Sequence, residues 1–195
     1  MKIFKYCIIL ICLAQSWNLS AQNYTEDSAA VSKTVQDFYS WYINAIKEKS
    51  VVDYQPRFAT TSKGMTTLDY IIYIENLKKY SFSESLIARE IQSYEGCIKN
   101  LEKVTYVDFK KKWLDISQFE EAGCDFTNNY KWIGAQEICD GSTIVIVEIN
   151  SNKAKVNGIL YDLNVDDNTI HDSVGDYEIS LEKENNVWKI TDIKQ

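Results

Sequence analysis

Apolar positions recur at helical spacing near the start of the chain. Between Ser28 and Lys49 the apolar residues stand three or four positions apart, which is typical of an amphipathic helix. Ser28 is a residue type that suits a helix cap. The apolar stripe consists of Val31, Val35, Phe38, Tyr42 and Ile46, widened by Tyr39 and Ile43. The pattern predicts a long helix that packs one face against a core.

Two further helices are predicted after this one. The first begins near Thr66, because Thr66 and Asp69 have the spacing of a capping box. The second is capped by Ser83 and ends at Gly96. Residues 98–113 fit neither the helical nor the strand period, and we expect irregular structure with a short helix there.

From Asp125 onward the pattern becomes that of strands. Residues 143–149 are a β-branched run that is apolar on both faces at its centre, which predicts a central strand. Three later segments alternate between polar and apolar residues, with short polar turns between strands: 155–163, 177–183 and 187–193. Four strands joined in this way predict an antiparallel meander. Helices followed by strands predict an α+β fold, with the helices on one face of a curved sheet.

The first residues have the order of a secretory signal. Lys2 and Lys5 precede an apolar run over 6–14, and Ala21 is the small residue expected before a cleavage site. The run is shorter than the ~20 residues of a spanning helix. We expect a signal peptide over 1–21, a single domain over 22–195, and an exported protein that is periplasmic or secreted. A buried N-terminal helix is the alternative.

Charge excludes some classes of partner. The chain carries a net charge of −7, which becomes −9 once Lys2 and Lys5 are removed with the signal. An acidic surface disfavours nucleic acid and anionic membranes, which bind Lys and Arg patches. No apolar stretch after residue 21 is long enough to span a membrane. We therefore expect no nucleic-acid partner and no transmembrane segment in the mature chain.

Three cysteines remain after the predicted cleavage. An odd number in an oxidising compartment predicts one disulfide and one free thiol. Cys124 and Cys139 are the preferred pair, because they flank one polar, aromatic segment. The alternative pair is Cys97 with Cys124. The chain has no CxxC motif, so neither a redox motif nor a zinc ribbon has its signature.

Most catalytic and cofactor motifs are missing. His171 is the only histidine, and it lies in the acidic segment 164–176, which we interpret as a solvated loop. The sequence has no GxSxG, GxGxxG or GxxxxGK[ST] motif, so no nucleophile elbow or phosphate-binding loop is predicted. The acidic segment lacks the ligand pattern of an EF-hand around Asp166. We expect no catalytic residue, no cofactor and no metal.

Residues 124–137 are the densest stretch of aromatic and hydrogen-bonding side chains. Tyr130, Trp132, Gln136 and Glu137 are residue types that recognise ligands or partners. The alternative interpretation is structural. In that case Trp132 fills the core, and Gln136 and Glu137 lead into the first strand.

Motifs at the two ends carry a resemblance. The first helix contains Phe38, Tyr39, Trp41 and Tyr42, and the last strand reads W-K-I-x-x-I over 188–193. Both resemble the cystatin-like, nuclear-transport-factor-2-like fold and, more narrowly, an exported bacterial family of unknown function, the YbjP/YqhG-like group. The likeness covers the two ends and the stretch 130–137.

The resemblance implies a long helix across a bent sheet that encloses a pocket. Isomerases of this fold place an acid and a tyrosine in that pocket, but no motif here identifies such a pair. The candidate ligand-binding residues are Tyr42, Trp132, Gln136, Glu137, Tyr161 and Trp188.

Three functions remain open from the sequence, and the last of them is a purely structural component of the cell envelope. The first is a non-catalytic binding protein that recognises an envelope protein, with an immunity or inhibitor role as one version of it. The second is a pocket for a small apolar ligand, in a carrier or an isomerase-like enzyme.

Overall fold

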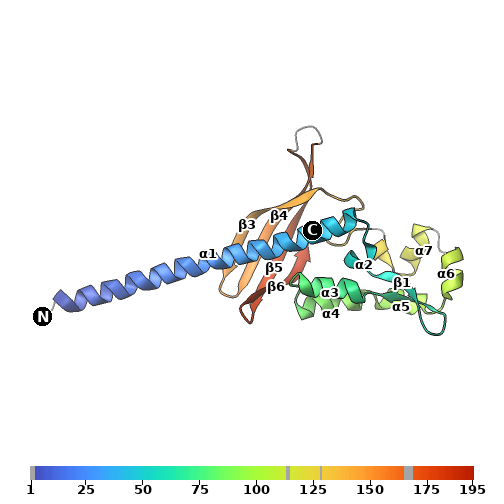
Figure 1. Cartoon of the computed structure of the whole chain (residues 1–195), viewed down its shortest axis with the longest axis horizontal. Helices are drawn as coiled ribbons and strands as arrows, with labels where there is room; N and C mark the ends of the chain where they lie inside the picture. The colour runs from blue at the N-terminus through green and yellow to red at the C-terminus, as the bar shows by residue number, and fades with distance from the viewer. Residues whose placement is uncertain (1–2, 113–114, 128, 165–168) are drawn as a thin grey trace.

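A computed structural model describes residues 3–112, 115–127, 129–164 and 169–195; for residues 3–24, Ile116, Asp125 and His171 it describes the backbone without side chains. The described chain is α+β, as predicted (Figure 1). The elements are α1 (Ile3–Lys47), α2 (Val51–Tyr54), β1 (Arg57–Thr60), β2 (Thr66–Asp69), α3 (Ile71–Lys79), α4 (Glu84–Ser93), α5 (Glu95–Leu101), α6 (Tyr106–Lys112), α7 (Ile116–Glu121), the 3-10 turn η1 (Asp125–Thr127), β3 (Gly141–Asn150), β4 (Lys153–Leu163), β5 (Ile170–Glu184) and β6 (Val187–Lys194).

The long helix packs its predicted face on the sheet. In Figure 1 α1 lies across one face of the four-stranded sheet, and it contacts β3, β4 and β6. Every residue of the predicted stripe is buried, with at most 5% of its surface exposed: Val31, Val35, Phe38, Tyr42 and Ile46. Ser28, predicted as a cap, lies within α1. The helical period of the sequence therefore correctly identified the face that meets the core.

The antiparallel meander is confirmed. The four-stranded sheet has the order β3-β4-β5-β6, and all neighbouring strands are antiparallel. The turn between β5 and β6 contains Asn185 and Asn186, whose φ angles are 49° and 64°. Positive φ at both central residues suits the right-handed twist of a tight hairpin, and asparagine tolerates it better than most residues.

Strand β3 lies at an edge of the sheet, so the prediction of a central strand is wrong. Its inward residues are Ile144, Val147 and Ile149, which pair with buried positions of β4. The register shifts between Ile144 and Ile146, and the outward Val145 and Ile146 are 61% and 48% exposed. A β-bulge interrupts the alternation at this point. The continuous apolar run therefore reflects a bulged edge strand.

The opposite edge of the sheet is covered by the segment that joins α3 to α4. The amide of Ser83 donates to the carbonyl of Ile190 at 2.8 Å, and the amide of Ile190 donates to the carbonyl of Ser81 at 2.8 Å. Phe82, between them, is 2% exposed. This short parallel pairing attaches the helical part of the molecule to β6, the last strand.

The helices between β2 and β3 differ from the prediction in detail. Residues 66–69 form β2, paired with β1, and α3 begins only at Ile71. Thr66 is buried, and its hydroxyl donates to the carbonyl of Val104 at 2.9 Å. Since that partner is far away in sequence, the local capping-box spacing was misleading. Ser83, by contrast, caps α4 as predicted, by accepting from the amide of Leu86 at 3.2 Å.

Two other expectations about local structure need correction. Gly96 does not end a helix, because it lies inside α5. Between residues 98 and 112 the chain completes α5 and forms α6. The acidic segment expected to be a loop contains the first part of β5, including the backbone of His171. Asp166, considered above for calcium, lies outside the described residues, as does the side chain of His171.

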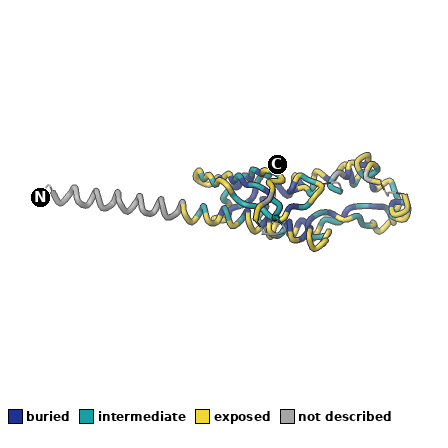
Figure 2. Tube along the Cα trace, turned by 90° about the horizontal axis from the view of Figure 1, so that it is seen from above, coloured by how far each residue is buried: buried dark blue, intermediate teal, exposed yellow. Residues whose placement is uncertain are grey.

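Buried residues occur in both halves of the molecule. Figure 2 shows them around the sheet and also in the half farther from the N-terminus. They form one hydrophobic cluster that joins the stripe of α1 to the inner face of the sheet and to the helices α3, α4 and α5. In the part of the chain that is described, no helix has both the length and the apolar character of a membrane span. The predicted cleavage after Ala21 stays a prediction.

Candidate functional site

The six candidate residues do not line a common cavity. Tyr42, Trp132 and Trp188 are buried, Tyr161 is half-buried, and Gln136 and Glu137 are exposed. Gln136 borders a small polar hollow of about 160 Å³ that Tyr54 and Tyr130 also line. Tyr161 borders a different one of about 200 Å³, beside Ser40 and Asn44 of α1.

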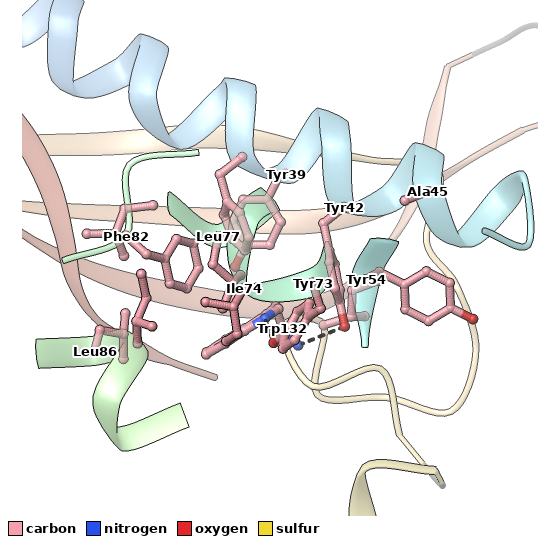
Figure 3. Close-up of a cluster of buried hydrophobic side chains, with 14 of the residues drawn as sticks. Tyr39, Tyr42, Ala45, Tyr54, Tyr73, Ile74, Leu77, Phe82, Leu86 and Trp132 are labelled. Carbon is pink, nitrogen blue, oxygen red and sulfur yellow. Dashed lines mark hydrogen bonds between the residues drawn. The ribbon is translucent and has the colours of Figure 1, made fainter. Parts of the chain in front are cut away.

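Tyr42 and Trp132 are in contact, but they belong to a packed core. The backbone amide of Trp132 donates to the hydroxyl of Tyr42 at 3.4 Å (Figure 3). The rings of Phe38 and Phe82 lie 5.0 Å apart, and Phe82 lies 5.3 Å from Trp132. Aromatic side chains fill the space beneath α1 at this point, and the ring of Trp132 is part of this packing.

Trp188 fixes α1 to the last hairpin at Asp27. Its indole N–H donates to Oδ1 of Asp27 at 3.1 Å, and Nζ of Lys183 donates to the same oxygen at 2.6 Å. The Lys183 ammonium, and secondarily the Trp188 indole, hold the pKa of Asp27 below its usual value against the opposing effect of burial. This contact anchors α1 to the hairpin of β5 and β6.

The disulfide is Cys97–Cys124, so the preferred pair Cys124–Cys139 is wrong and the alternative is confirmed. The two Cα atoms lie 4.9 Å apart, and both cysteines are fully buried. Cys139 is free and buried, and desolvation raises the pKa of its thiol to about 11. The pairing depends on the packing of α5 against the segment after α7, which spacing along the chain does not reveal.

The most unusual buried group is the carboxylate of Glu90 on α4. Its side chain is only 1% exposed. Because glutamate is rarely buried without a partner, this burial calls for groups that compensate the charge. Oε1 accepts hydrogen bonds from the hydroxyl of Tyr73, at 2.8 Å, and from the hydroxyl of Tyr94. Oε2 accepts from Nζ of Lys131, which forms an ion pair with it. Three donors therefore satisfy this buried charge.

The network continues into the aromatic core. The indole N–H of Trp132 donates to the hydroxyl of Tyr73 at 3.0 Å, and Tyr73 donates onward to Glu90. Desolvation, with the nearby charge of Glu90 as a smaller cause, raises the pKa values of Tyr73 and Tyr94 far above the usual range. Both phenols therefore keep their protons and act as donors at neutral pH.

A cavity opens on the outer side of this network. It has a volume of about 340 Å³, in the range of small-molecule pockets. Tyr94 and Phe126 supply aromatic walls, with their rings 5.3 Å apart, and Lys131 supplies a charged group. The remaining lining residues are Ser93, Gly123, Asn129 and Gly134. The disulfide lies against this site, since Cys124 directly follows Gly123.

The sequence analysis missed Glu90, Tyr73, Tyr94 and Lys131. One signal was present: Leu86, Glu90 and Tyr94 are four residues apart, so Glu90 lies on the apolar face of its helix. A charged residue in such a stripe indicates a buried, paired group. Its distant partners, Tyr73 of α3 and Lys131 of the segment before β3, could not be identified from any local pattern.

The carboxylate of Glu90 is not placed to act as a general base. A general base must reach a substrate proton, but Glu90 is enclosed and already accepts from three donors. Across the described ranges, no group of three or more His, Cys, Asp and Glu side chains is arranged to hold a metal ion.

No known protein family, characterised protein or solved structure gives a significant match to this chain.

Proposed function

We propose that this chain is an exported, non-catalytic binding protein with a small-molecule site in the cavity that Tyr94, Phe126 and Lys131 line. The observation that carries the proposal is the ion pair that the buried Glu90 forms with the partly exposed Lys131 at the side of that cavity. A buried ion pair contributes little net stability compared with apolar packing. A role in recognition gives a reason for its presence.

The fold is proposed to be cystatin-like, of the nuclear-transport-factor-2-like kind. A long helix that lies across a four-stranded antiparallel meander supports this. The ligand site, however, lies beside α4 and the segment before β3, not between α1 and the sheet, where aromatic side chains fill the core. Export rests on the signal-like segment 1–21, and mass spectrometry of the N-terminus of the exported protein tests it.

A fragment screen tests the binding site. Small polar and aromatic fragments are added to ¹⁵N-labelled protein, and changes in amide chemical shifts are recorded. We expect fragments to shift the resonances of Ser93, Gly123 and Gly134. Asn129→Ala should weaken their binding, while Gln136→Ala should not, because only Asn129 lines this cavity. Fragments that shift other regions alone, or none at all, would contradict the proposal.

A second candidate function is recognition of an envelope protein. Val145 and Ile146 are exposed on β3, and among the described strands none pairs with the outer edge of β3. An exposed strand edge can accept a strand from a partner. Affinity capture with cross-linking tests this. A partner retained by the native protein and lost in Ile146→Lys would support it, and equal capture by both would refute it.

A further inference from the structure

The ammonium of Lys131 lies in an unusually complete binding site for a cation. It forms an ion pair with Glu90, and Oγ of Ser93 lies 3.5 Å from Nζ. It also lies over two aromatic rings, 5.6 Å from the centroid of Tyr94 and 5.3 Å from that of Trp132. A carboxylate combined with aromatic faces is the arrangement that proteins use to bind organic ammonium ligands.

We infer that the ligand of this cavity is a primary organic ammonium whose head group takes the place of Lys131 against Glu90. The inference rests on the proposed function, because it assigns a ligand class to the same cavity. In the unliganded protein Lys131 occupies the cation site from within the chain. On binding, its side chain turns to water and the ligand ammonium forms the ion pair.

The side chains of Lys131 and Glu90 differ in how easily they can move out of the ion pair. The side chain of Lys131 is 37% exposed, whereas that of Glu90 is 1% exposed. A lysine has a flexible stem with a strongly hydrated head, so its ammonium can move into water. Glu90 is held by Tyr73 and Tyr94 and cannot follow it. The carboxylate is therefore the fixed part of the site and the ammonium is the exchangeable part.

Only a cationic ligand can make this exchange without leaving a buried charge unpaired. Removal of one partner from a buried ion pair is strongly destabilising. When one ammonium replaces another, Glu90 stays paired throughout. A neutral ligand would leave the carboxylate uncompensated, and an anion would be repelled by it.

The shape and the charge of the molecule agree with this ligand class. The cavity of about 340 Å³ is lined by Lys131 together with Tyr94 and Phe126, whose rings can cover an apolar tail. The chain carries a net charge of −7 and so attracts cations over a longer range. The expected ligand thus has an ammonium head and a short apolar or aromatic body.

The test uses variants in which the internal cation is absent. In Lys131→Ala the site is open, and we expect n-butylammonium at ten times its Kd to raise Tm by about 3–6 °C. Sodium butyrate and sodium chloride at equal ionic strength should give no such rise. Glu90→Gln combined with Lys131→Ala keeps the open space but lacks the carboxylate, so the effect of butylammonium should disappear there.

Lys131→Met serves if Lys131→Ala fails to fold, because methionine keeps most of the stem. Native protein gives a further readout: butylammonium should shift the side-chain NMR signals of Lys131 and leave those of Lys183, which pairs with Asp27, unchanged.

The outcomes separate this inference from the proposed function. Stabilisation by butylammonium that requires Glu90 supports both. If butyrate or neutral fragments bind the cavity and butylammonium does not, the ammonium inference is overturned while the binding function stands. An equal effect of butylammonium in all variants is a general salt effect and overturns the inference. If no probe of any charge binds, both fail.

Discussion

The indole N–H of Trp132 lies 3.0 Å from the hydroxyl oxygen of Tyr73. This hydrogen bond joins the aromatic core beneath α1 to the buried carboxylate of Glu90, because the hydroxyl of Tyr73 in turn donates a hydrogen bond to that carboxylate. Trp132 therefore makes two separable contributions to the stability of the fold: its ring packs in the core, and its N–H group orients Tyr73.

Trp132→Phe and Trp132→Ala should separate those contributions. Phenylalanine keeps an aromatic ring and loses the donor, so we expect a loss of about 1 kcal/mol in the free energy of unfolding. Alanine also creates a cavity, and the expected loss is about 3–5 kcal/mol. Urea denaturation measures both. Equal losses would mean that the N–H group, and not the packing of the ring, dominates.

Removal of Lys131 and removal of Glu90 should lower the free energy of unfolding by different amounts. Lys131→Met leaves a buried carboxylate without its cation, with an expected loss of about 3–5 kcal/mol. Glu90→Gln keeps an acceptor for the two phenols and lets the lysine reach water, so about 1–2 kcal/mol should be lost. Denaturant titration at neutral pH gives both values. The double variant should lose less than the sum of the two, and additive losses would show that the pair does not interact.

Removal of the Cys97–Cys124 disulfide should destabilise the protein by about 3–4 kcal/mol, through a gain in entropy of the unfolded chain. The variant is Cys97→Ala with Cys124→Ala, and the measurement is thermal unfolding of the oxidised proteins. Cys139→Ala is the control. Peptide mapping of unreduced protein should give a fragment that links residues 97 and 124. A fragment linking Cys139 would contradict the structure.

The thiol of Cys139 should be slow to react in the folded protein. It is 1% exposed, and burial raises its pKa to about 11, so little thiolate is present at neutral pH. In protein prepared without residues 1–21, which contain Cys7 and Cys12, thiol titration should find no accessible group in the native state and one after denaturation.

Asp27 should make stability depend on pH in the acid range. Its pKa is lowered in the folded state by Lys183 and Trp188, so its contribution is complete above the unfolded pKa of about 3.9. The contribution disappears as the pH falls through the lower, folded value. The difference in unfolding free energy between native protein and Asp27→Asn should therefore be about 1–2 kcal/mol at pH 7 and much smaller at pH 2.

Asp37→Asn is the matched control for this experiment, because Asp37 is an exposed carboxylate of the same helix that pairs with Lys33. It should change stability little at either pH. A constant difference for Asp27→Asn across the pH range would contradict the assignment.

Local patterns predicted those parts of the fold that depend on neighbours in sequence. The stripe from Val31 to Ile46 and the cap at Ser83 follow from helical geometry, and the β5–β6 hairpin follows from two asparagines that tolerate positive φ. The β1–β2 hairpin was missed, because Thr66 bonds to Val104 and not to its own turn.

The candidate site depends on distant contacts, which explains why it was not predicted. Glu90 is separated from Tyr73 by 17 residues along the chain and from Lys131 by 41, and the two cysteines of the disulfide are 27 residues apart. The sequence did show that residues 124–137 are rich in recognition residues, and Lys131 lies within this stretch. The packing of the whole domain determines which of these residues face the cavity. Trp132 is buried in the core, whereas Asn129 and Lys131 line the cavity.

The pairing of residues 81–83 with β6 has a consequence for how the protein is made. The amide of Ser83 finds its acceptor at Ile190, close to the end of the chain. Contacts of such large sequence separation form late and slow down folding. The segment that joins α3 to α4 cannot form this pairing before the last strand has been synthesised. A premature stop ahead of Val187 would remove one strand from the sheet and would leave the backbone groups of Ser81 and Ser83 without their partners at Ile190, so we expect truncated chains to expose the core and to be cleaved by proteases.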